Sequence, residues 1–142
     1  MQDGDLSRPG SLFVYGTLMK VSGSPMAKRL HAESAYVGPG RIRGSLYLLG
    51  YYPGLVRAER NTDCVFGEVV KLRNPLRSLR WLDSYEGCGP DDPEPRMYER
   101  VIVPVTLRSG ETVTAWTYLY KGNVALARRL PGGRFLKNRP CG

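Results

Sequence analysis

The hydrophobic residues of the chain fall mainly into short runs and alternating stretches, which is the pattern of strands. The apolar run Ser11–Tyr15 ends at a glycine and predicts a buried first strand. Glycines mixed with β-branched and aromatic residues over Tyr36–Leu49 predict a bent or bulged strand. Two more strands are expected over Gly54–Ala58 and Cys64–Leu72, on either side of a polar turn.

Clean alternation in the second half of the chain predicts a β-hairpin. Met97–Leu107 and Glu111–Tyr120 flank a turn at Arg108–Gly110. Aliphatic residues occupy one face of the first strand (Val101, Val103, Val105 and Leu107), and aromatic residues share a face of the second (Trp116, Tyr118 and Tyr120). Pro104 lacks an amide hydrogen, so its strand is expected at a sheet edge or with a bulge there.

Capping signals predict two helices. Ser24 followed by proline predicts a capped helix over Pro25–His31. Asn74 followed by proline predicts the clearest helix, from Pro75 to about Glu86, which Gly87 ends. The leucines of this helix recur at the spacing of one helical face (Leu76, Leu79 and Leu82). A proline- and glycine-rich loop follows as far as position 96.

These elements amount to five or six strands and two or three short helices, the third helix being expected over Val124–Leu130. They do not alternate as they would in a doubly wound sheet. We therefore predict an α+β fold, a small mixed or antiparallel β-barrel-like sheet with a few short helices. A length of 142 residues fits one domain over residues 1–142, with residues 1–10 and 131–142 as flexible tails.

Composition and charge narrow the classes of function. Hydrophobic residues make up 42% of the chain, enough for a core of its own. The chain shows no apolar run behind a basic start, so neither a secretory signal nor a membrane span is expected. We therefore expect a cytoplasmic location. The net charge of +8 favours anionic partners, including small substrates that bear carboxylates. Nucleic acid is not expected, because the basic residues are scattered and their densest group resembles a solvated tail (Arg128, Arg129, Arg134, Lys137 and Arg139).

The cysteines and the single histidine disfavour several chemistries. Cys64, Cys88 and Cys141 lie far apart and lack the spacing of a metal or redox motif. His31 alone would have to serve any Ser-His or Cys-His pair or zinc site, and an ordinary helix-end or surface histidine is the simpler interpretation. No metal site is expected, and a hydrolase that uses Cys88 as its nucleophile stays an alternative.

Two sequence motifs are candidates for chemistry. The first strand leads into Tyr15–Leu18 (YGTL), where Gly16 lets a ligand approach closely and backbone N–H groups without a ladder partner either bind an anion or oxyanion or form a plain turn. The motif LDSYEG places Asp83 and Glu86 in the last turn of the clearest helix. The negative end of a helix raises the pKa of an acid, and partial desolvation would bring that pKa into the range of a general base, although exposed acids also occur there.

The predicted hairpin supplies a third group, Tyr98, Arg100, Tyr118 and Tyr120. Tyrosines on strands mostly pack by their rings and keep the hydroxyl group in water. Arg100 and Tyr120 are nevertheless candidates for holding a substrate carboxylate.

The order of these motifs resembles the γ-glutamylcyclotransferase-like family. YGTL after the first strand, LDSYEG at a helix end, and MYERVIVPV with AWTYLY as a hairpin follow one another over most of the chain. The resemblance implies a small α+β barrel whose YGTL loop, here Tyr15, Gly16, Thr17 and Leu18, embraces a γ-glutamyl group. It implies that Glu86 is the catalytic acid and base, and that no metal or organic cofactor is needed.

The implied reaction cleaves a γ-glutamyl amine, dipeptide or related amide and releases 5-oxoproline and the free amine. The α-amino group attacks the γ-carbonyl carbon of the same molecule, so the enzyme needs no nucleophile of its own. Glu86 would transfer the proton, and amides of the YGTL loop would receive the oxyanion. The sequence departs from the family after Leu18 (MKVSGSPM) and after Gly122, which affects substrate choice more than chemistry. A non-catalytic module of the same fold that binds γ-glutamyl or acidic small molecules is the alternative function.

Overall fold

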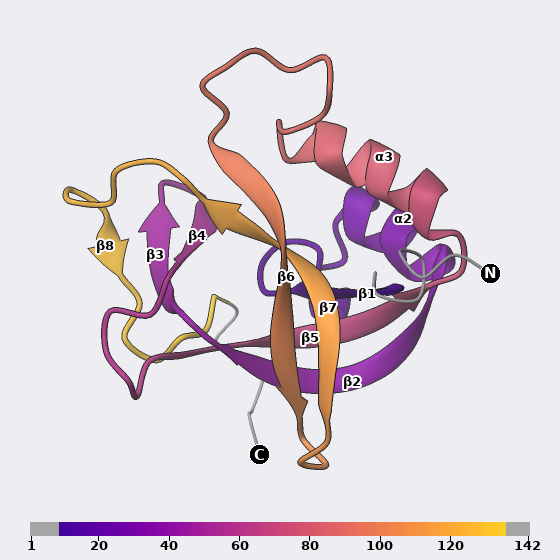
Figure 1. Ribbon diagram of the computed structural model, residues 1–142, viewed down its shortest axis with the longest axis horizontal. Helices are drawn as coiled ribbons and strands as arrows, with labels where there is room; N and C mark the ends of the chain where they lie inside the picture. Colours follow the sequence, from indigo (N-terminus) through magenta and orange to yellow (C-terminus); the bar gives the residue numbers. More distant parts are fainter. Residues whose placement is uncertain (1–8, 136–142) are drawn as a thin grey trace.

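A closed five-stranded barrel forms the centre of the protein, in a computed structural model that describes residues 9–135. In the order in which they neighbour one another, its strands are β1 (Ser11–Val14), β5 (Cys64–Leu72), β2 (Ser34–Arg43), β6 (Tyr98–Leu107) and β7 (Thr112–Tyr120). A three-stranded sheet lies beside the barrel and consists of β4 (Tyr52–Val56), β3 (Ser45–Leu49) and β8 (Arg128–Arg129) (Figure 1). The predicted α+β class with a barrel-like sheet is confirmed.

Strand β1 is buried on both faces, as its uninterrupted apolar sequence predicts. Leu12 and Val14 pack into one hydrophobic cluster, whereas Phe13 and the following Tyr15 pack into another. The strand runs antiparallel to β5 and closes the barrel through a parallel pairing of Leu12 with Trp116 of β7. These pairings fix the position at which the chain leaves β1 and enters the YGTL segment.

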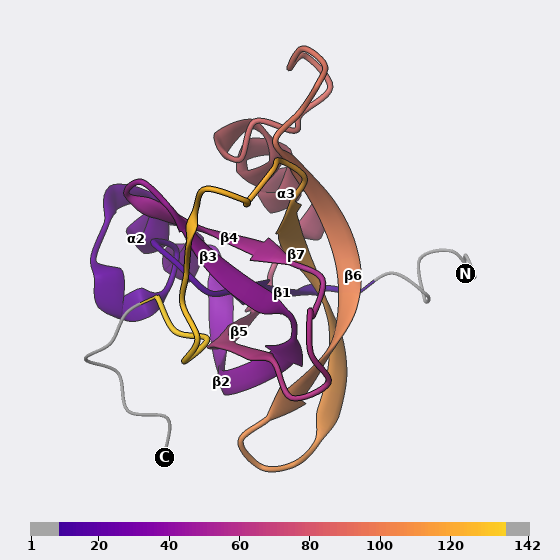
Figure 2. The same cartoon turned by 90° about the vertical axis from the view of Figure 1, so that its left-hand side faces the viewer.

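Two helices cover one side of the barrel, α2 (Pro25–Ala32) and α3 (Pro75–Tyr85), with a single 3-10 turn, η1 (Lys20–Ser22), before α2 (Figure 1, Figure 2). Both begin at their predicted caps. The Oγ of Ser24 accepts a hydrogen bond from the Ala27 amide at 3.2 Å, and the Oδ1 of Asn74 accepts one from the Arg77 amide at 3.3 Å. These bonds satisfy amides that a helix start leaves without partners.

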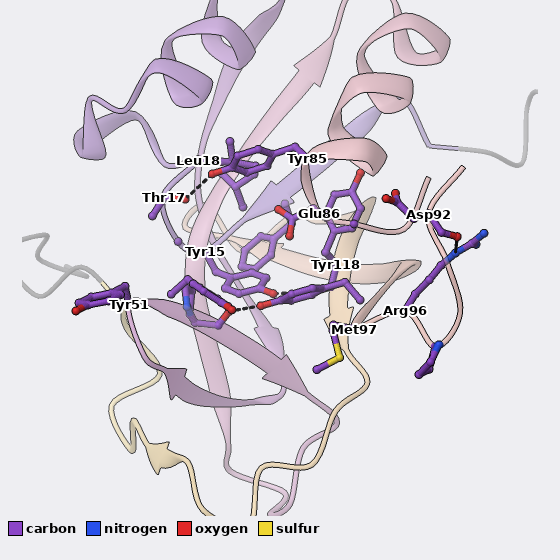
Figure 3. A pocket seen from close by; sticks show the side chains of 18 of the residues that line it. Tyr15, Thr17, Leu18, Tyr51, Tyr85, Glu86, Asp92, Arg96, Met97 and Tyr118 are labelled. Atoms are coloured by element: carbon purple, nitrogen blue, oxygen red, sulfur yellow. Dashed lines mark hydrogen bonds between the residues drawn. The ribbon is translucent and has the colours of Figure 1, made fainter. Parts of the chain in front are cut away.

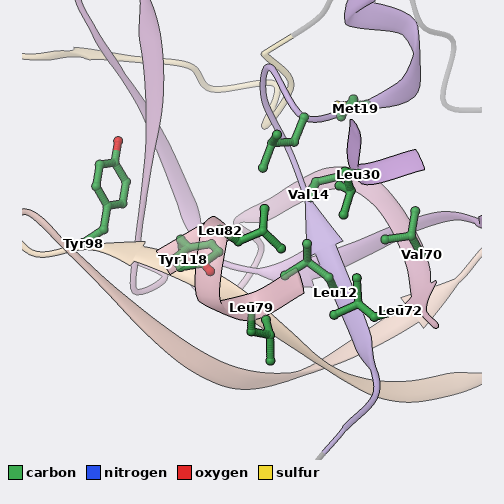
Figure 4. Packing of buried hydrophobic residues seen from close by; sticks show 11 residues of the cluster. Leu12, Val14, Met19, Leu30, Val70, Leu72, Leu79, Leu82, Tyr98 and Tyr118 are labelled. Carbon is green, nitrogen blue, oxygen red and sulfur yellow. The ribbon is translucent and has the colours of Figure 1, made fainter. Parts of the chain in front are cut away.

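Both helices bury leucines in the cluster that contains Leu12 (Figure 4). Leu79 and Leu82 of α3 are 8% and 0% exposed, but Leu76 is 82% exposed, so the prediction of one shared leucine face is wrong for Leu76. At 3.6 residues per turn, Leu76 lies about 120° around the helix from Leu82. The buried face of α3 instead includes Ser78, whose hydroxyl group donates a hydrogen bond to Glu33 at 2.8 Å.

The remaining strands follow the predicted order with one refinement. The bent strand expected over Tyr36–Leu49 is two strands, β2 with a register shift between Tyr36 and Gly38, and β3. The hairpin of β6 and β7 forms in antiparallel register. Pro104 lies outside the pairing of β6 with β2, which involves only Thr106 and Leu107 of β6. The position of this proline is therefore as expected for a residue without an amide hydrogen.

The helix expected over Val124–Leu130 is wrong. The segment forms turns and then β8, which pairs with β3, and the Leu130 amide donates a hydrogen bond to the Leu46 carbonyl at 2.8 Å. Pairing with a distant strand outweighs the weak local preference of this short segment for helix. No helix in the described part of the chain is both long and apolar enough to cross a membrane.

Parts of the two predicted tails are held by backbone contacts. The Pro9 carbonyl accepts a hydrogen bond from the Trp116 indole at 3.1 Å, and the Gly10 carbonyl accepts one from the Leu72 amide at 2.8 Å. Near the other end, the carbonyl of the buried Gly133 accepts one from the Phe66 amide at 2.8 Å. Residues 1–8 and 136–142, which include Lys137, Arg139 and Cys141, lie outside the described residues.

Candidate active site

One cavity of about 660 Å³ brings the YGTL and LDSYEG motifs together (Figure 3). Its volume lies within the range of ~300–1,000 Å³ that is usual for small-molecule sites. The inner wall consists of residues at the end of β1 and after it, with two tyrosines of the hairpin: Phe13, Val14, Tyr15, Gly16, Thr17, Leu18, Tyr98 and Tyr118. The β3–β4 turn adds Tyr51, the start of β4 adds Tyr52 and Pro53, and the end of α3 with the loop after it adds Tyr85, Glu86, Gly87, Asp92, Pro93, Pro95, Arg96 and Met97.

In the YGTL loop, the backbone carbonyl groups of positions 16–18 have polar partners, whereas no described residue accepts a hydrogen bond from the backbone amides of the same positions. The Gly16 carbonyl accepts a hydrogen bond from the Met19 amide at 3.0 Å, the Thr17 carbonyl accepts one from the Ser24 hydroxyl at 2.8 Å, and the Leu18 carbonyl lies 3.1 Å from the His31 Nε2. The amides of positions 16–18 donate no hydrogen bond to another described residue. Because backbone amides seldom lack an acceptor, these N–H groups form a candidate anion or oxyanion site at the cavity wall.

Two further contacts hold this loop in place. The Lys20 amide donates a hydrogen bond at 2.8 Å to the carboxylate of Glu68, a residue of β5 that is completely buried. Thr17 Oγ1 lies 3.3 Å from the Tyr85 hydroxyl group, so the YGTL loop touches the last residue of α3 directly. The two motifs are therefore linked by a side-chain contact as well as by the cavity between them.

Gly16 is required for a different reason from the one that the sequence suggests. A Cβ atom at this position would lie 2.7 Å from Cγ and 3.1 Å from Cδ of Pro53. The expectation was that glycine leaves room for a ligand, but the space is occupied by the proline of β4. Gly16 thus allows the β3–β4 turn to close against the YGTL loop.

Glu86 is the residue that caps the C-terminal end of α3. Gly87 has φ of 76°, its amide donates a hydrogen bond to the Ser84 carbonyl at 3.1 Å, and the Cys88 amide donates one to the Asp83 carbonyl at 2.9 Å. This pair of bonds is the Schellman arrangement, which uses a left-handed glycine to stop a helix. It fixes Glu86 one residue before the turn, and Figure 3 shows its carboxyl group pointing into the cavity toward Tyr15.

The environment of Glu86 raises the pKa of its carboxyl group from 4.5 to about 7, first because the group is buried and second because the negative Asp83 is near. No cation pairs with this carboxyl group in the described part of the chain. Burial disfavours the ionised form when nothing compensates its charge. The sequence suggested that the helix end and partial desolvation together raise this pKa; burial is the main cause here, and Asp83 is the second.

Asp83 connects Glu86 to the hairpin without itself lining the cavity. Its carboxylate accepts two hydrogen bonds from Arg100, at 2.8 and 3.2 Å, and one from the Tyr118 hydroxyl group at 2.7 Å. The Arg100 guanidinium also lies 4.2 Å from the Trp116 ring. This network orients α3 on the hairpin and places a fixed negative charge behind Glu86.

The structure does not bring Arg100 and Tyr120 to the cavity, in contrast to the sequence-based expectation. Arg100 is engaged by Asp83, and the Tyr120 ring packs edge-on against Tyr98 with 5.4 Å between centroids. Among the described residues that line the cavity, neither appears. Their alternation on the strands was predicted correctly, but the side chains point to partners that local patterns do not reveal.

Three tyrosines make a neutral inner wall. The Tyr15 hydroxyl group donates a hydrogen bond to the Tyr118 carbonyl at 2.6 Å, and the Tyr98 hydroxyl group donates one to the Pro53 carbonyl at 3.0 Å. Burial raises the pKa of Tyr15, Tyr98 and Tyr118 well above the ordinary value. The phenols therefore stay protonated at neutral pH.

The histidine and the cysteine do not form a nucleophilic pair in this structure. His31 lies in the last turn of α2 and contacts the Leu18 carbonyl, so the helix-end interpretation is confirmed. Cys88 packs beside the hydrophobic cluster, and burial, followed by Asp83 and Glu86, raises the pKa of its thiol to about 11. A thiol with this pKa is almost entirely protonated at neutral pH, which argues against a cysteine hydrolase.

Several lining residues have no signature in the sequence. Tyr51 sits in the β3–β4 turn and Tyr52 begins β4, whereas Asp92 and Arg96 sit in the loop after α3. The only available signals were two adjacent tyrosines beside a proline and a proline-rich stretch without periodicity. Neither signal shows that these segments face the YGTL loop, because that contact depends on how the small sheet packs on the barrel.

Comparison with known proteins places the chain in a family. The chain belongs to the family described as gamma-glutamyl cyclotransferase, AIG2-like, whose sequence profile matches residues 12–137. The resemblance noted from the motifs is confirmed. Membership of this family supports a cyclotransferase-type function in general terms. A comparison with curated protein sequences found no match.

Solved structures share the fold. An AIG2-like protein from Mus musculus is 25% identical, with a TM-score of 0.69 over 94% of this chain and 92% of that one. YkqA from Bacillus subtilis is also 25% identical, with a TM-score of 0.65 over 88% of this chain, which spans only 39% of YkqA. A structure described as gamma-glutamyl cyclotransferase is 18% identical, with a TM-score of 0.57 over 84% of this chain and 68% of that one, and shows the common fold.

Proposed function

We propose that this protein cleaves a γ-glutamyl amide by intramolecular cyclisation and releases 5-oxoproline and the free amine. The observation that carries the proposal is the meeting of two groups at one cavity. Glu86 supplies a carboxyl group with a pKa of about 7, and the loop at positions 16–18 supplies amides that have no acceptor among the described residues. A base that titrates near neutral pH and a set of fixed N–H donors are what such a cyclisation requires.

The proposed reaction moves one proton through Glu86. The neutral α-amino nitrogen of the substrate attacks the γ-carbonyl carbon, and a new C–N bond closes the five-membered ring. The ionised Glu86 takes a proton from that nitrogen, while the amides of positions 16–18 stabilise the negative oxygen. The carbon–nitrogen bond to the leaving amine then breaks as Glu86 donates the proton to the departing nitrogen, which restores the carboxylate.

The residues proposed to bind the γ-glutamyl group are Tyr15, Gly16, Thr17 and Leu18. Their backbone is held from both sides, by Glu68 through the Lys20 amide and by the carbonyl contacts described above. A preorganised loop spends no energy on ordering when substrate arrives. We assign no direct substrate contact to Arg100 or Tyr120, because neither lines the cavity.

The test is a product assay on γ-glutamyl amides that differ in the amine. We expect 5-oxoproline and the amine to appear in equal amounts, measured by mass spectrometry. The matched control is the same amide with an acetylated α-amino group, which cannot attack and must stay intact. Repeating the reaction in ¹⁸O-labelled water separates cyclisation, which incorporates no label, from hydrolysis, which yields labelled glutamate.

Two outcomes would overturn the proposal. Cleavage of the acetylated amide with label incorporation would show that water, rather than the α-amino group, is the nucleophile. Binding of γ-glutamyl amides in the cavity without any release of amine would instead favour a binding module of the same fold.

A further inference from the structure

We propose that the amine released by this protein is an uncharged aromatic or bulky apolar amine, bound by an aromatic rim at the mouth of the cavity. The inference rests on the cyclotransferase function proposed above and names its substrate class. The rim is defined by six lining residues that are exposed to solvent: Tyr51, Tyr52, Tyr85, Pro93, Pro95 and Met97.

The rim side chains are far more exposed than is usual for such groups. Tyr51 is 93% exposed, Tyr52 is 52%, Met97 is 48% and Tyr85 is 45%, whereas the tyrosines of the inner wall are all below 10%. Within the described residues, these four are among only ten large hydrophobic side chains that are exposed. Apolar side chains that gather around a cavity mouth indicate a ligand that covers them.

The γ-glutamyl group alone does not fill the cavity. A volume of about 660 Å³ corresponds to roughly 20 water-sized volumes, since one water occupies ~30 Å³. A γ-glutamyl group has about nine non-hydrogen atoms and would occupy the inner part beside Glu86 and the YGTL loop. The remaining space lies toward the rim, where the leaving amine must be placed because the scissile bond adjoins the γ-carbonyl group.

The charges around the cavity argue against a charged leaving group. Among the described lining residues, Arg96 is the only cation, and it is already 3.4 Å from the Glu94 carboxylate and 3.3 Å from the Asp92 carbonyl. Glu86 and Asp92 contribute negative charge, so a carboxylate on the amine, as in a dipeptide, would be disfavoured. A cation on the amine would have to approach a chain whose net charge is +8, and the six rim residues include no carboxylate to receive it.

Uncharged aromatic and apolar groups suit the rim in shape as well as in charge. Tyrosine rings bind other rings by stacked or edge-on contacts, and methionine adapts its thioether to an aromatic surface. Figure 3 shows Tyr51 on one side of Glu86 and Met97 with Arg96 on the other, so an amine bound at the mouth has apolar side chains of the rim on both sides of it. A methyl or ethyl group would leave most of the rim in water.

The first experiment measures binding without chemistry. Glutaric acid monophenethylamide and glutaric acid monoethylamide lack the α-amino group, so neither can cyclise. We expect calorimetric titration to show about 10- to 100-fold tighter binding of the phenethylamide, from burial of its ring. Tyr51→Ala should reduce this ratio to below about threefold, and Tyr51→Phe, which keeps the ring, should preserve it. Leu126→Ala, a fully exposed residue away from the cavity, is the control that should leave the ratio unchanged.

The second experiment compares kcat/KM for four γ-glutamyl amides, of phenethylamine, ethylamine, 1,4-diaminobutane and phenylalanine. The phenethylamide is expected to be the best substrate by about tenfold or more, with the same dependence on Tyr51. Equal binding of the two glutaramides, no binding of either, or preference for the diaminobutane or phenylalanine compound would overturn the inference. If the glutaramides show the expected preference but no amide releases 5-oxoproline, the rim inference stands and the proposed function fails. If 5-oxoproline forms equally from all four amides, the proposed function stands and the rim inference fails.

Discussion

Replacing Glu86 by glutamine is expected to stabilise the protein at alkaline pH. The carboxyl group has a pKa of about 7 in the folded protein and an ordinary value of 4.5. One pKa unit corresponds to about 1.36 kcal/mol, so ionising this partly buried group costs the folded state ~3 kcal/mol. Because the folded pKa is raised, the stability linked to the protonated carboxyl group is fully present below pH 4.5 and is lost as the pH rises through about 7.

Glutamine has nearly the same shape and no charge, so the variant does not lose this stability. Between pH 5 and pH 8.5, Glu86→Gln should gain ~2.5 kcal/mol in free energy of unfolding relative to the wild type. Any cost of packing the amide is the same at both pH values and cancels in the comparison. Urea titrations at the two pH values, followed by the fluorescence of Trp81 and Trp116, measure the difference.

The control is Glu99→Gln, which removes an exposed carboxylate on β6. It should change stability by less than ~0.5 kcal/mol at either pH. A Glu86→Gln effect that is the same at pH 5 and pH 8.5 would refute the reasoning, because it would mean that Glu86 titrates normally and is not desolvated.

Three other substitutions test individual features of the site. Asp83→Asn removes the second cause of the raised pKa of Glu86, so the acidic limb of the pH profile of kcat/KM should move to lower pH; an unmoved limb would contradict the assigned cause. Gly16→Ala places a Cβ against Pro53 and should cost ~1–3 kcal/mol of stability, whereas Gly132→Ala, which has open space around it, should cost little, as chemical denaturation would show. Cys88→Ser should keep 5-oxoproline release within about threefold, because the thiol is protonated and lies outside the cavity; a loss of 100-fold or more would revive the cysteine mechanism.

The sequence predicted the elements whose causes are local. Ser24 and Asn74 are caps whose side-chain bonds form as expected, and Gly87 stops α3 because it adopts a left-handed conformation. The hairpin followed from alternation and turn chemistry in the same way. These features depend on neighbours within a few residues, so their signals are visible without the fold.

The failures arose where distant segments decide the outcome. The Val124–Leu130 segment pairs with β3 instead of forming a helix, and the exposure of Leu76 depends on how α3 rests on the barrel. Arg100 was expected to hold a substrate carboxylate, and in the structure it pairs with Asp83 in the last turn of α3. An interaction between oppositely charged residues that are far apart in the chain leaves no local pattern.

The candidate site was predictable in its principal residues and not in its extent. Glu86 and the YGTL loop were singled out from a helix end and a strand end, and the structure places both at one cavity. The rim could not be anticipated, because Tyr51 and Met97 line the same cavity only once the small sheet and the loop following α3 have packed around the barrel.

The central claim is that Glu86 transfers the proton in the cyclisation, and the most direct measurement is 5-oxoproline release by Glu86→Gln at pH 8. Proton transfer by a positioned side chain contributes about 10²- to 10⁴-fold to rate, so kcat should fall at least 100-fold while the glutaramide still binds. Circular dichroism identical to that of the wild type would show that the fold is kept. Release at a rate within about threefold of the wild type would contradict the claim.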